Sequence, residues 1–255
     1  MGKIISIVNQ KGGVGKTTTT INLSASFAYE GRRVLLIDSD PQSNSTSGMG
    51  LIREEVTTSI YDVYAGHALI KDVIRATDYE RLFIVPSIID LLAVEVELVN
   101  KERREWVLCD ALKDVRDDYD YILIDCPPSL SLLTLNCLVA SNGVLIPVQC
   151  EYYALEGLSM LTRTLDMVQK TFNPYLEISG ILLTMYDSRN TLSNQVVNEV
   201  KGYFGNKVYE TLIPRNVTLG EAPGHGKPAM YYDRRSKGAQ TYLTLAGEIL
   251  EKGLG

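Results

Sequence analysis

The sequence predicts an α/β fold in one domain covering residues 1–255, with a mostly parallel, twisted sheet and helices on both of its faces. Short apolar runs alternate with helix-length segments along the chain, which is typical of parallel β-α-β units. No Pro/Gly/Ser-rich linker, low-complexity tract or internal repeat divides the sequence. A chain of 255 residues with 45% hydrophobic composition is long enough to bury a complete core of this kind.

Strands are expected where short apolar runs end at polar or turn residues. The run at 34–37 ends at Asp38-Ser39-Asp40-Pro41, and the run at 121–125 closes with an acid. The predicted strands are residues 4–8, 34–37, 82–86, 121–125, 143–148, 178–185 and a short one at 208–213.

Helices are predicted between these strands. The first should stop at Gly31, because glycine accommodates the left-handed conformation that ends many helices. Residues 88–116 carry Glu and Lys/Arg along one face, which favours a helix there. Residues 42–80 show no clear period, apart from the start of a short helix at 61–64. The predicted helices are residues 16–30, 88–116, 130–140, 154–171, 192–204 and 236–252.

A glycine-rich loop lies between the first strand and the first helix. Residues 11–18 read Lys-Gly-Gly-Val-Gly-Lys-Thr-Thr, and such a turn lets several backbone N–H groups converge on a phosphate. Lys16 can then reach the β- and γ-phosphates, and the Thr17 hydroxyl can ligate Mg²⁺. Where a standard P-loop has its first glycine, this chain has Gln10, and a second lysine, Lys11, follows. A dinucleotide-binding turn fits less well, because Thr18 occupies the third glycine position of that motif.

Three acids follow predicted strands and can converge with this loop, since ligands bind at the carboxyl ends of parallel strands. Asp125 is expected to hold Mg²⁺ directly or through water; the alternative is a helix N-cap. Asp38 and Asp40 would share a face of an extended strand end. One of them, preferably Asp40, is expected to orient the water that attacks a γ-phosphate, and the alternative is an Asp-Pro turn.

The net charge of −6 argues against nucleic-acid binding by the whole surface. Residues 1–200 carry 17 Lys/Arg against 26 Asp/Glu, whereas residues 201–237 carry 7 against 3. The basic segment is either a footprint for a phosphate backbone or ordinary solvated surface. Four cysteines without C-x-x-C spacing, no signal peptide and no membrane-length apolar run predict a cytoplasmic protein with reduced thiols.

Five motifs together resemble the deviant-Walker ATPases, and within that class the ParA/Soj chromosome-partitioning ATPases. The resemblance runs nearly from end to end. The motifs are the loop at 11–18 with its leading lysine, Asp38-Ser39-Asp40-Pro41-Gln42, Asp125-Cys126-Pro127-Pro128-Ser129, residues 149–157, and Ile213-Pro214-Arg215-Asn216.

This resemblance implies a Mg²⁺-dependent ATPase with a weak intrinsic rate, in which ATP is sandwiched in a homodimer. Lys11 would cross the interface onto the partner's nucleotide, and the catalytic residues would be Lys11, Lys16 and Asp40. Magnesium would be held by Thr17, Asp40 and Asp125. The residues implied at the nucleotide are Lys11, Gly12, Gly13, Val14, Gly15, Lys16, Thr17, Thr18, Glu151, Pro214, Arg215 and Asn216.

The resemblance also implies partners and a place in the cell. The ATP-bound dimer would bind double-stranded DNA non-specifically on the bacterial nucleoid, and a ParB-type centromere-binding protein would stimulate hydrolysis and release it. The sequence departs from the family where Thr218 stands in place of a basic residue and Gly220 and Gly224 replace serines. The basic residues expected to contact DNA instead are Arg189, Lys201, Lys227, Arg234 and Arg235; Arg189 could alternatively pair with Asp187.

Three other functions share some of these motifs. A MinD-like positioning ATPase should end in a basic amphipathic membrane helix, but residues 241–255 hold one basic residue, Lys252, against two glutamates. We therefore expect no membrane partner. A nitrogenase-iron-protein-like reductase would need two cluster-binding cysteines, and Cys126 lies in the Asp125 motif instead. A scaffold with a degenerate ATP site conflicts with the intact Lys16, Thr17 and Asp125. No N-terminal helix-turn-helix extension is expected, which disfavours binding to a specific operator.

Overall fold

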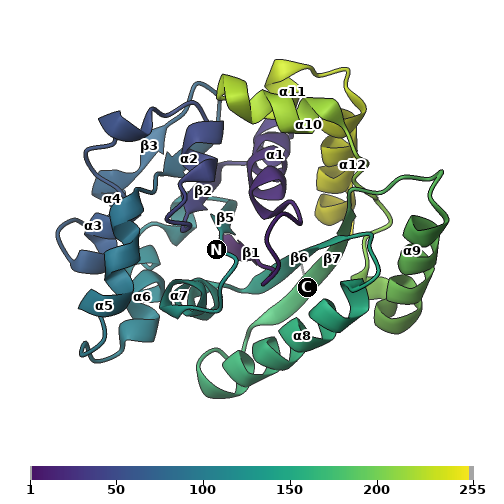
Figure 1. Cartoon of the computed structure of the whole chain (residues 1–255). Helices are drawn as coiled ribbons and strands as arrows, with labels where there is room; N and C mark the ends of the chain where they lie inside the picture. Colours follow the sequence, from purple (N-terminus) through teal and green to yellow (C-terminus); the bar gives the residue numbers. More distant parts are fainter. Residues whose placement is uncertain (1, 253–255) are drawn as a thin grey trace.

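A seven-stranded sheet forms the centre of the computed structural model, which describes residues 2–252 (Figure 1). The strand order is β3-β4-β2-β5-β1-β6-β7, and every neighbouring pair is parallel except β3 with β4. This confirms the predicted mostly parallel sheet. The strands are β1 (Lys3–Ile7), β2 (Val34–Asp38), β3 (Arg75–Ala76), β4 (Leu82–Val85), β5 (Tyr121–Asp125), β6 (Gly143–Gln149) and β7 (Glu177–Thr184).

Helices cover both faces of the sheet because the strands are apolar on both sides. Along β2, Leu35 and Ile37 pack into one core, whereas Val34 and Leu36 pack into the other. The core that contains Val34 and Leu36 lies under α1 (Lys16–Tyr29), α11 (Ala229–Tyr232) and α12 (Lys237–Lys252). The core that contains Leu35 and Ile37 lies under five other helices (Figure 1). Those are α3 (Ile60–Ala65), α6 (Val107–Leu112), α7 (Leu132–Ala140), α8 (Ala154–Thr171) and α9 (Thr191–Phe204).

The single helix predicted for residues 88–116 is wrong. The segment forms short turns, because Asn136 on α7 holds its backbone at two points: the Asn136 side-chain oxygen accepts from the Leu108 N–H at 3.2 Å, and its amide donates to the Arg104 carbonyl at 2.8 Å. Directly before the first of these points along the chain, Arg103 has a left-handed φ of 55°. The pieces are 3₁₀ turns at Ile89–Ala93, Arg104–Trp106 and Arg116–Asp118, with α5 (Val94–Glu97) and α6 between them.

The strand predicted at 208–213 is reduced to isolated bridges beside β7. Only Ile181 with Val208 and Tyr186 with Pro214 pair. The ring of Tyr209 lies across Gly180, where a Cβ would approach the ring to 2.3 Å. The large side chain therefore packs against bare backbone, while Pro214 cannot donate a ladder bond.

Residues 42–80, which had no clear period, contain short helices. They are α2 (Asn44–Gly48), a 3₁₀ turn at Arg53–Glu55, α3 and α4 (Ile70–Val73). Helix α2 packs close to a second irregular region: a Cβ on Gly226 would lie only 2.6 Å from the Gly50 Cα. That second region, predicted to be irregular and basic, contains α10 (Val217–Glu221), a 3₁₀ turn at Ala222–His225 and α11.

Candidate nucleotide and magnesium site

The loop between β1 and α1 is held in a phosphate-cradling shape by two glycines and two side chains. Gly13 and Gly15 have φ of 75° and 91°, which side chains rarely tolerate. The Asn9 amide donates to the Pro147 carbonyl at 2.8 Å, and its oxygen accepts from the Lys11 N–H at 2.9 Å. Thr184 on β7 donates to the Val14 carbonyl at 2.8 Å. The loop is therefore fixed to β6 and β7, with the N-terminus of α1 at its end.

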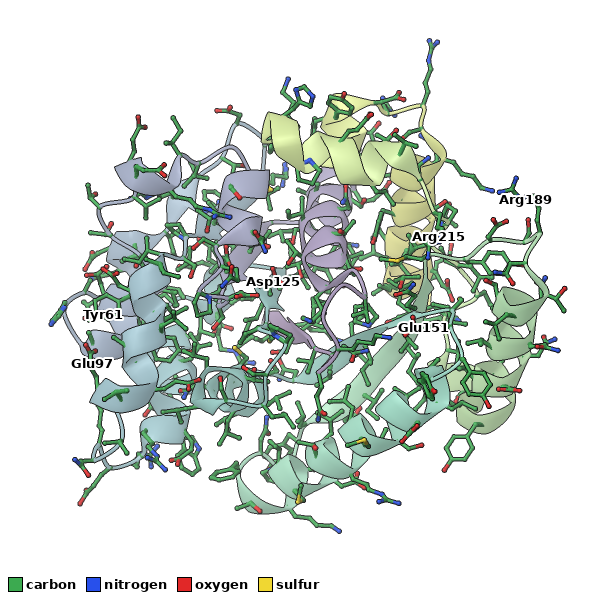
Figure 2. The ribbon with its side chains drawn as sticks, viewed as in Figure 1. Tyr61, Glu97, Asp125, Glu151, Arg189 and Arg215 are labelled. Atoms are coloured by element: carbon green, nitrogen blue, oxygen red, sulfur yellow. The ribbon has the colours of Figure 1, made fainter. Side chains whose placement is uncertain are left out.

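Asp125 lies at the carboxyl end of β5 (Figure 2), where it contacts Thr17. The Thr17 hydroxyl donates to Asp125 Oδ2 at 2.8 Å, which leaves the threonine oxygen lone pairs free. Ser45 also donates to Oδ2, at 2.7 Å. The second oxygen, Oδ1, has only a long 3.4 Å contact from Thr20, so it is the carboxylate oxygen open to a metal or its water. This donor set of hydroxyl and carboxylate oxygens fits Mg²⁺.

Lys16 is buried beside these groups. Its side chain is 7% exposed, and its Nζ donates to the Lys11 carbonyl at 3.1 Å. Burial lowers the pKa of Lys16, and the negative charges of Asp125 and Asp40 partly oppose that shift. An anionic phosphate in the loop would compensate the buried ammonium in the same way.

Asp38 and Asp40 have different surroundings, although they are two residues apart. Asp38 is completely buried. Its carboxylate accepts hydrogen bonds from the N–H and the hydroxyl of Thr46, both at 2.7 Å, and from the Asp40 N–H at 3.2 Å. Burial and the neighbouring Asp125 raise the pKa of Asp38. Burial likewise raises the pKa of Asp125. One carboxylate oxygen of Asp40, Oδ1, accepts from the Gln42 N–H at 2.9 Å, and the other accepts no hydrogen bond from residues 2–252.

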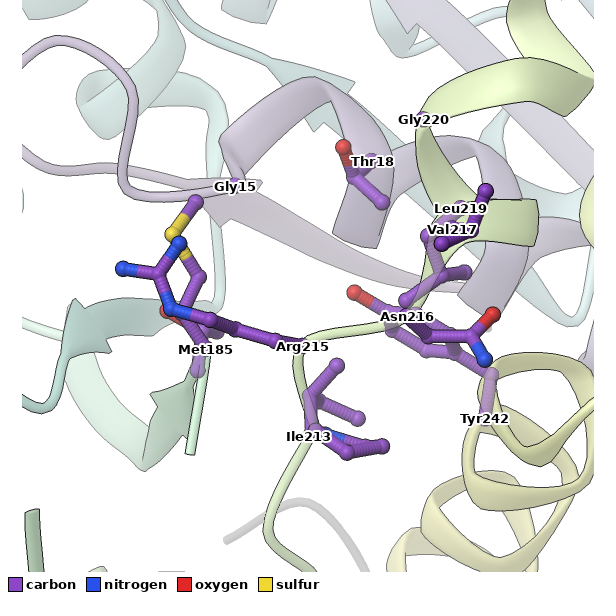
Figure 3. A pocket seen from close by; sticks show the side chains of 12 residues that line it. Gly15, Thr18, Met185, Ile213, Arg215, Asn216, Val217, Leu219, Gly220 and Tyr242 are labelled. Atoms are coloured by element: carbon purple, nitrogen blue, oxygen red, sulfur yellow. The ribbon is translucent and has the colours of Figure 1, made fainter. Parts of the chain in front are cut away.

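A pocket of about 420 Å³ opens on the other side of the loop (Figure 3). Asn216 and Tyr242 lie on one side of it, with Arg215 and Met185 opposite. Asn216 Oδ1 is buried against Gly238 without a hydrogen-bond donor. This oxygen would meet a base only after the Asn216 amide turns from Gly238 toward the pocket. The pocket is largely apolar and adjoins the phosphate loop, which suits a purine base. The lining residues are Gly15, Thr18, Thr184, Met185, Ile213, Pro214, Arg215, Asn216, Val217, Leu219, Gly220 and Tyr242.

Comparisons with known proteins agree with this geometry. Residues 2–178 match the family model described as an AAA domain. The chain is 57% identical to the sporulation initiation inhibitor protein Soj of Bacillus subtilis over 253 residues, covering 99% of this chain and 100% of that one. It is 53% identical to the chromosome partitioning protein ParA of Myxococcus xanthus, covering 99% and 89%. The chain belongs to the Soj/ParA family of chromosome-partitioning ATPases.

A solved structure with a similar fold contains an ATP analogue and magnesium. The protein described as cobyrinic acid a,c-diamide synthase of Mycobacterium smegmatis, bound to an ATP analogue and magnesium, superposes with a TM-score of 0.88 at 37% identity. The superposition covers 98% of this chain and 95% of that chain. The agreement extends the likeness from sequence to the whole fold.

Lys11 and Glu151 form an ion pair at the edge of the Soj/ParA loop, with their side chains 52% and 30% exposed. Glu151 lies at the end of β6 (Figure 2), and the next two residues, Tyr152 and Tyr153, are 76% and 66% exposed. In this single subunit Lys11 therefore faces its own chain, beside an unusually exposed aromatic pair. Gly12 has open space around its Cα, since a Cβ there would meet nothing within 4 Å.

Three of the five basic residues expected to contact DNA already have partners within the chain. Arg189 forms a bidentate ion pair with Asp187 at 2.9 and 3.0 Å, which is the alternative to DNA contact that the sequence left open. Lys201 pairs with Glu210, and Arg234 bonds Tyr29 and stacks on its ring. Within residues 2–252, the exposed side chains of Lys227 and Arg235 have no ionic partner.

Sequence reasoning missed the residues that hold the acids in place. Ser45 and Thr46 on α2 bond Asp125 and Asp38, and the Thr46 hydroxyl also accepts from the Ser87 N–H at 2.9 Å. Their only signal was a segment rich in hydroxyl residues at 43–47, which follows the Asp-Pro turn after one glutamine. The burial of two cysteines agrees with setting aside the reductase alternative. Cys126 and Cys137 are fully buried, so neither is placed to share a metal cluster with a second subunit.

Proposed function

We propose that the chain binds ATP with Mg²⁺ in the loop and hydrolyses it to ADP and phosphate, acting as the nucleotide switch of a DNA-partitioning system. The observation that carries this proposal is the 2.8 Å bond between Thr17 and Asp125, beside the buried ammonium of Lys16. These groups match the requirements of a magnesium-bound triphosphate. Family membership and the magnesium–nucleotide complex of the M. smegmatis protein support it.

Each residue of the site has a role in this proposal. Lys16 and the loop amides hold the β- and γ-phosphates, and Thr17 with Asp125 Oδ1 binds the metal, which neutralises charge on the phosphates. Asp40 orients the attacking water, since its carboxylate retains a free oxygen, whereas Asp38 is engaged internally. Asn216 reads the base, with Pro214 and Arg215 beside it.

We further propose that ATP joins two copies into a homodimer. Lys11 would leave Glu151 and contact the partner's nucleotide, because the phosphates offer more negative charge than one carboxylate. The exposed Tyr152 and Tyr153, together with Leu130 at 46% exposure, supply apolar surface for such an interface. Lys11 thereby becomes catalytic only in the dimer.

The dimer is proposed to bind double-stranded DNA through its phosphate backbone, and a ParB-type partner to release it by stimulating hydrolysis. Lys227 and Arg235 are the strongest candidates for DNA contacts, because Arg189, Lys201 and Arg234 already have partners. No arginine finger was identified in the sequence, so a partner-supplied group would explain the acceleration of a slow ATPase.

A membrane-positioning role is the less supported alternative. The apolar face of α12 packs against α1, with Tyr242, Leu245, Ala246 and Ile249 all buried. That face is not free to enter a lipid surface. Across residues 2–252, none of the helices has the length and apolar character needed to cross a bilayer.

The experiment that tests the proposal measures binding to an unrelated DNA duplex with ATP, with ADP and without nucleotide, at two salt concentrations. An Asp40→Ala variant, which should trap the ATP state, is compared with the wild type. Salt-sensitive binding with ATP only, retained in the variant, supports the switch. ATP-driven dimerisation without DNA binding in any state contradicts the DNA role. Co-sedimentation of the protein with liposomes in the presence of ATP would favour the membrane alternative.

A further inference from the structure

Two adjacent residues of α2 each hold one of the buried carboxylates of the site. Ser45 donates to Asp125 Oδ2 at 2.7 Å, and Thr46 donates twice to Asp38 Oδ2 at 2.7 Å. All four side chains are completely buried. Helix α2 thus connects the ends of β2 and β5, which are neighbouring strands in the sheet.

The Ser45 bond determines which Asp125 oxygen remains available. Oδ2 accepts from both Ser45 and Thr17, so both of its lone pairs are used. Oδ1 then carries the open acceptor position, and the carboxylate cannot rotate without breaking two short bonds. Loss of the Ser45 hydroxyl would leave the Thr17 bond and the long 3.4 Å contact from Thr20 to orient the carboxylate, and Thr17 is itself a proposed metal ligand.

The Thr46 bonds act on the next segment of the site. Asp38 Oδ1 accepts from the Asp40 N–H at 3.2 Å, so the carboxylate held by Thr46 in turn holds the backbone of Asp40. The Thr46 hydroxyl also accepts from the Ser87 N–H, which ties the chain after β4 to the same point. One hydroxyl therefore joins the ends of β2 and β4.

We propose that Ser45 and Thr46 are positioning residues for the magnesium site, with Ser45 fixing the Asp125 carboxylate and Thr46 fixing Asp38 and the backbone of Asp40. Both residues lie on α2, outside the phosphate loop and outside the lining of the adjoining pocket. This inference rests on the proposed binding of ATP with Mg²⁺ and adds the residues that orient its acids. Partners that orient metal ligands commonly contribute about 10–100-fold to metal affinity or activity.

The test uses the full chain and a fluorescent ADP analogue, first without Mg²⁺ and then with increasing Mg²⁺ at fixed nucleotide. For Ser45→Ala we expect the Mg²⁺ midpoint to rise about tenfold, while the affinity for Mg²⁺-free nucleotide changes less than about twofold. Ser47→Ala is the matched control, because Ser47 lies on the same helix but bonds the carbonyls of Ser43 and Asn44. Its midpoint should stay at the wild-type value.

Thr46 is tested by the pair Thr46→Val and Thr46→Ser. Valine keeps the shape and removes the hydroxyl, so the Mg²⁺ midpoint should rise; serine keeps the hydroxyl and should restore it. A Ser45→Ala midpoint within about twofold of wild type, in protein with a native circular dichroism spectrum, overturns the positioning role of Ser45. If the Mg²⁺ midpoint of Thr46→Ser is as high as that of Thr46→Val, the hydroxyl role of Thr46 is overturned. A wild-type chain whose ADP binding ignores Mg²⁺ contradicts the proposed function itself, which separates the two failures.

Discussion

Lys11 and Glu151 form an ion pair within one subunit, at the edge of the loop that is proposed to hold ATP. If Lys11 reaches a second subunit's nucleotide, Glu151 competes with that nucleotide for the same ammonium. Lys11→Ala should then abolish ATP-dependent dimerisation, whereas Glu151→Ala should preserve or strengthen it. Sedimentation velocity with ATP in the Asp40→Ala background measures both.

The two variants also distinguish a purely structural ion pair. If the pair only stabilises the fold, both alanine variants lose the same interaction and should behave alike in dimerisation and in thermal unfolding. Equal behaviour would therefore contradict the crossing role of Lys11. Glu151→Gln, which keeps the side-chain volume, checks that the charge is what matters.

Asn216 should select adenine over guanine. Once its oxygen turns from Gly238 into the pocket, the side-chain amide can accept from the adenine amino group and donate to a neighbouring ring nitrogen, whereas the corresponding edge of guanine offers two acceptors. We expect Asn216→Ala to lower the preference for ATP over GTP by about tenfold, in line with the value of one paired contact. Competition of ATP and GTP for a fluorescent nucleotide measures this. Val217→Ala, in the same pocket but 72% exposed, should leave the preference unchanged.

Lys227 should contribute one phosphate contact to DNA binding. Lys227→Ala is expected to reduce the slope of log affinity against log salt by about one. Arg189→Ala should change the slope less, because Asp187 already neutralises that guanidinium. Asp187→Ala provides the converse test: it frees Arg189 and should steepen the slope if Arg189 lies near DNA. An unchanged slope in Lys227→Ala would remove this residue from the interface.

Asp38 should make the fold less stable as the pH rises toward neutrality. Burial and the nearby Asp125 raise the pKa of Asp38 in the folded chain, whereas an unfolded aspartate titrates near about 3.9. The folded state therefore binds the proton more tightly, and stability is lost as pH rises from that value toward the raised pKa. Asp38→Asn should show a flatter dependence of unfolding free energy on pH between about 4 and 8. An equally steep dependence in Asp38→Asn would contradict this, and Asp90→Asn, at an exposed carboxylate, should retain the wild-type slope.

The sheet and the phosphate loop could be predicted because they depend on local patterns. The buried run at 121–125 and the glycines at 13 and 15 have the same meaning in almost any context: one is a strand apolar on both faces, and the others permit positive φ. The short turns between 88 and 116 could not be predicted, since they depend on Asn136, a residue that follows them in the sequence and lies on another helix.

The site was predictable in its ligands and not in their supports. Lys16, Thr17 and Asp125 belong to motifs whose spacing reflects the geometry of phosphate and magnesium. Ser45 and Thr46 bond acids that lie 80 and 8 residues away, and hydroxyl residues are common in loops, so their pattern predicts nothing specific. Long-range partners of this kind emerge only when the strands are placed side by side.

The close approach of Gly50 and Gly226 brings the segment after α2 into direct contact with the segment before Lys227. A Cβ on either glycine would overlap or crowd the other's backbone, so the two turns touch without any side chain between them. One turn follows the helix that carries Ser45 and Thr46, and the other directly precedes Lys227. The segment that follows α2 and the peptide that precedes Lys227 therefore meet backbone against backbone, so a larger residue at position 50 or 226 would push the two segments apart.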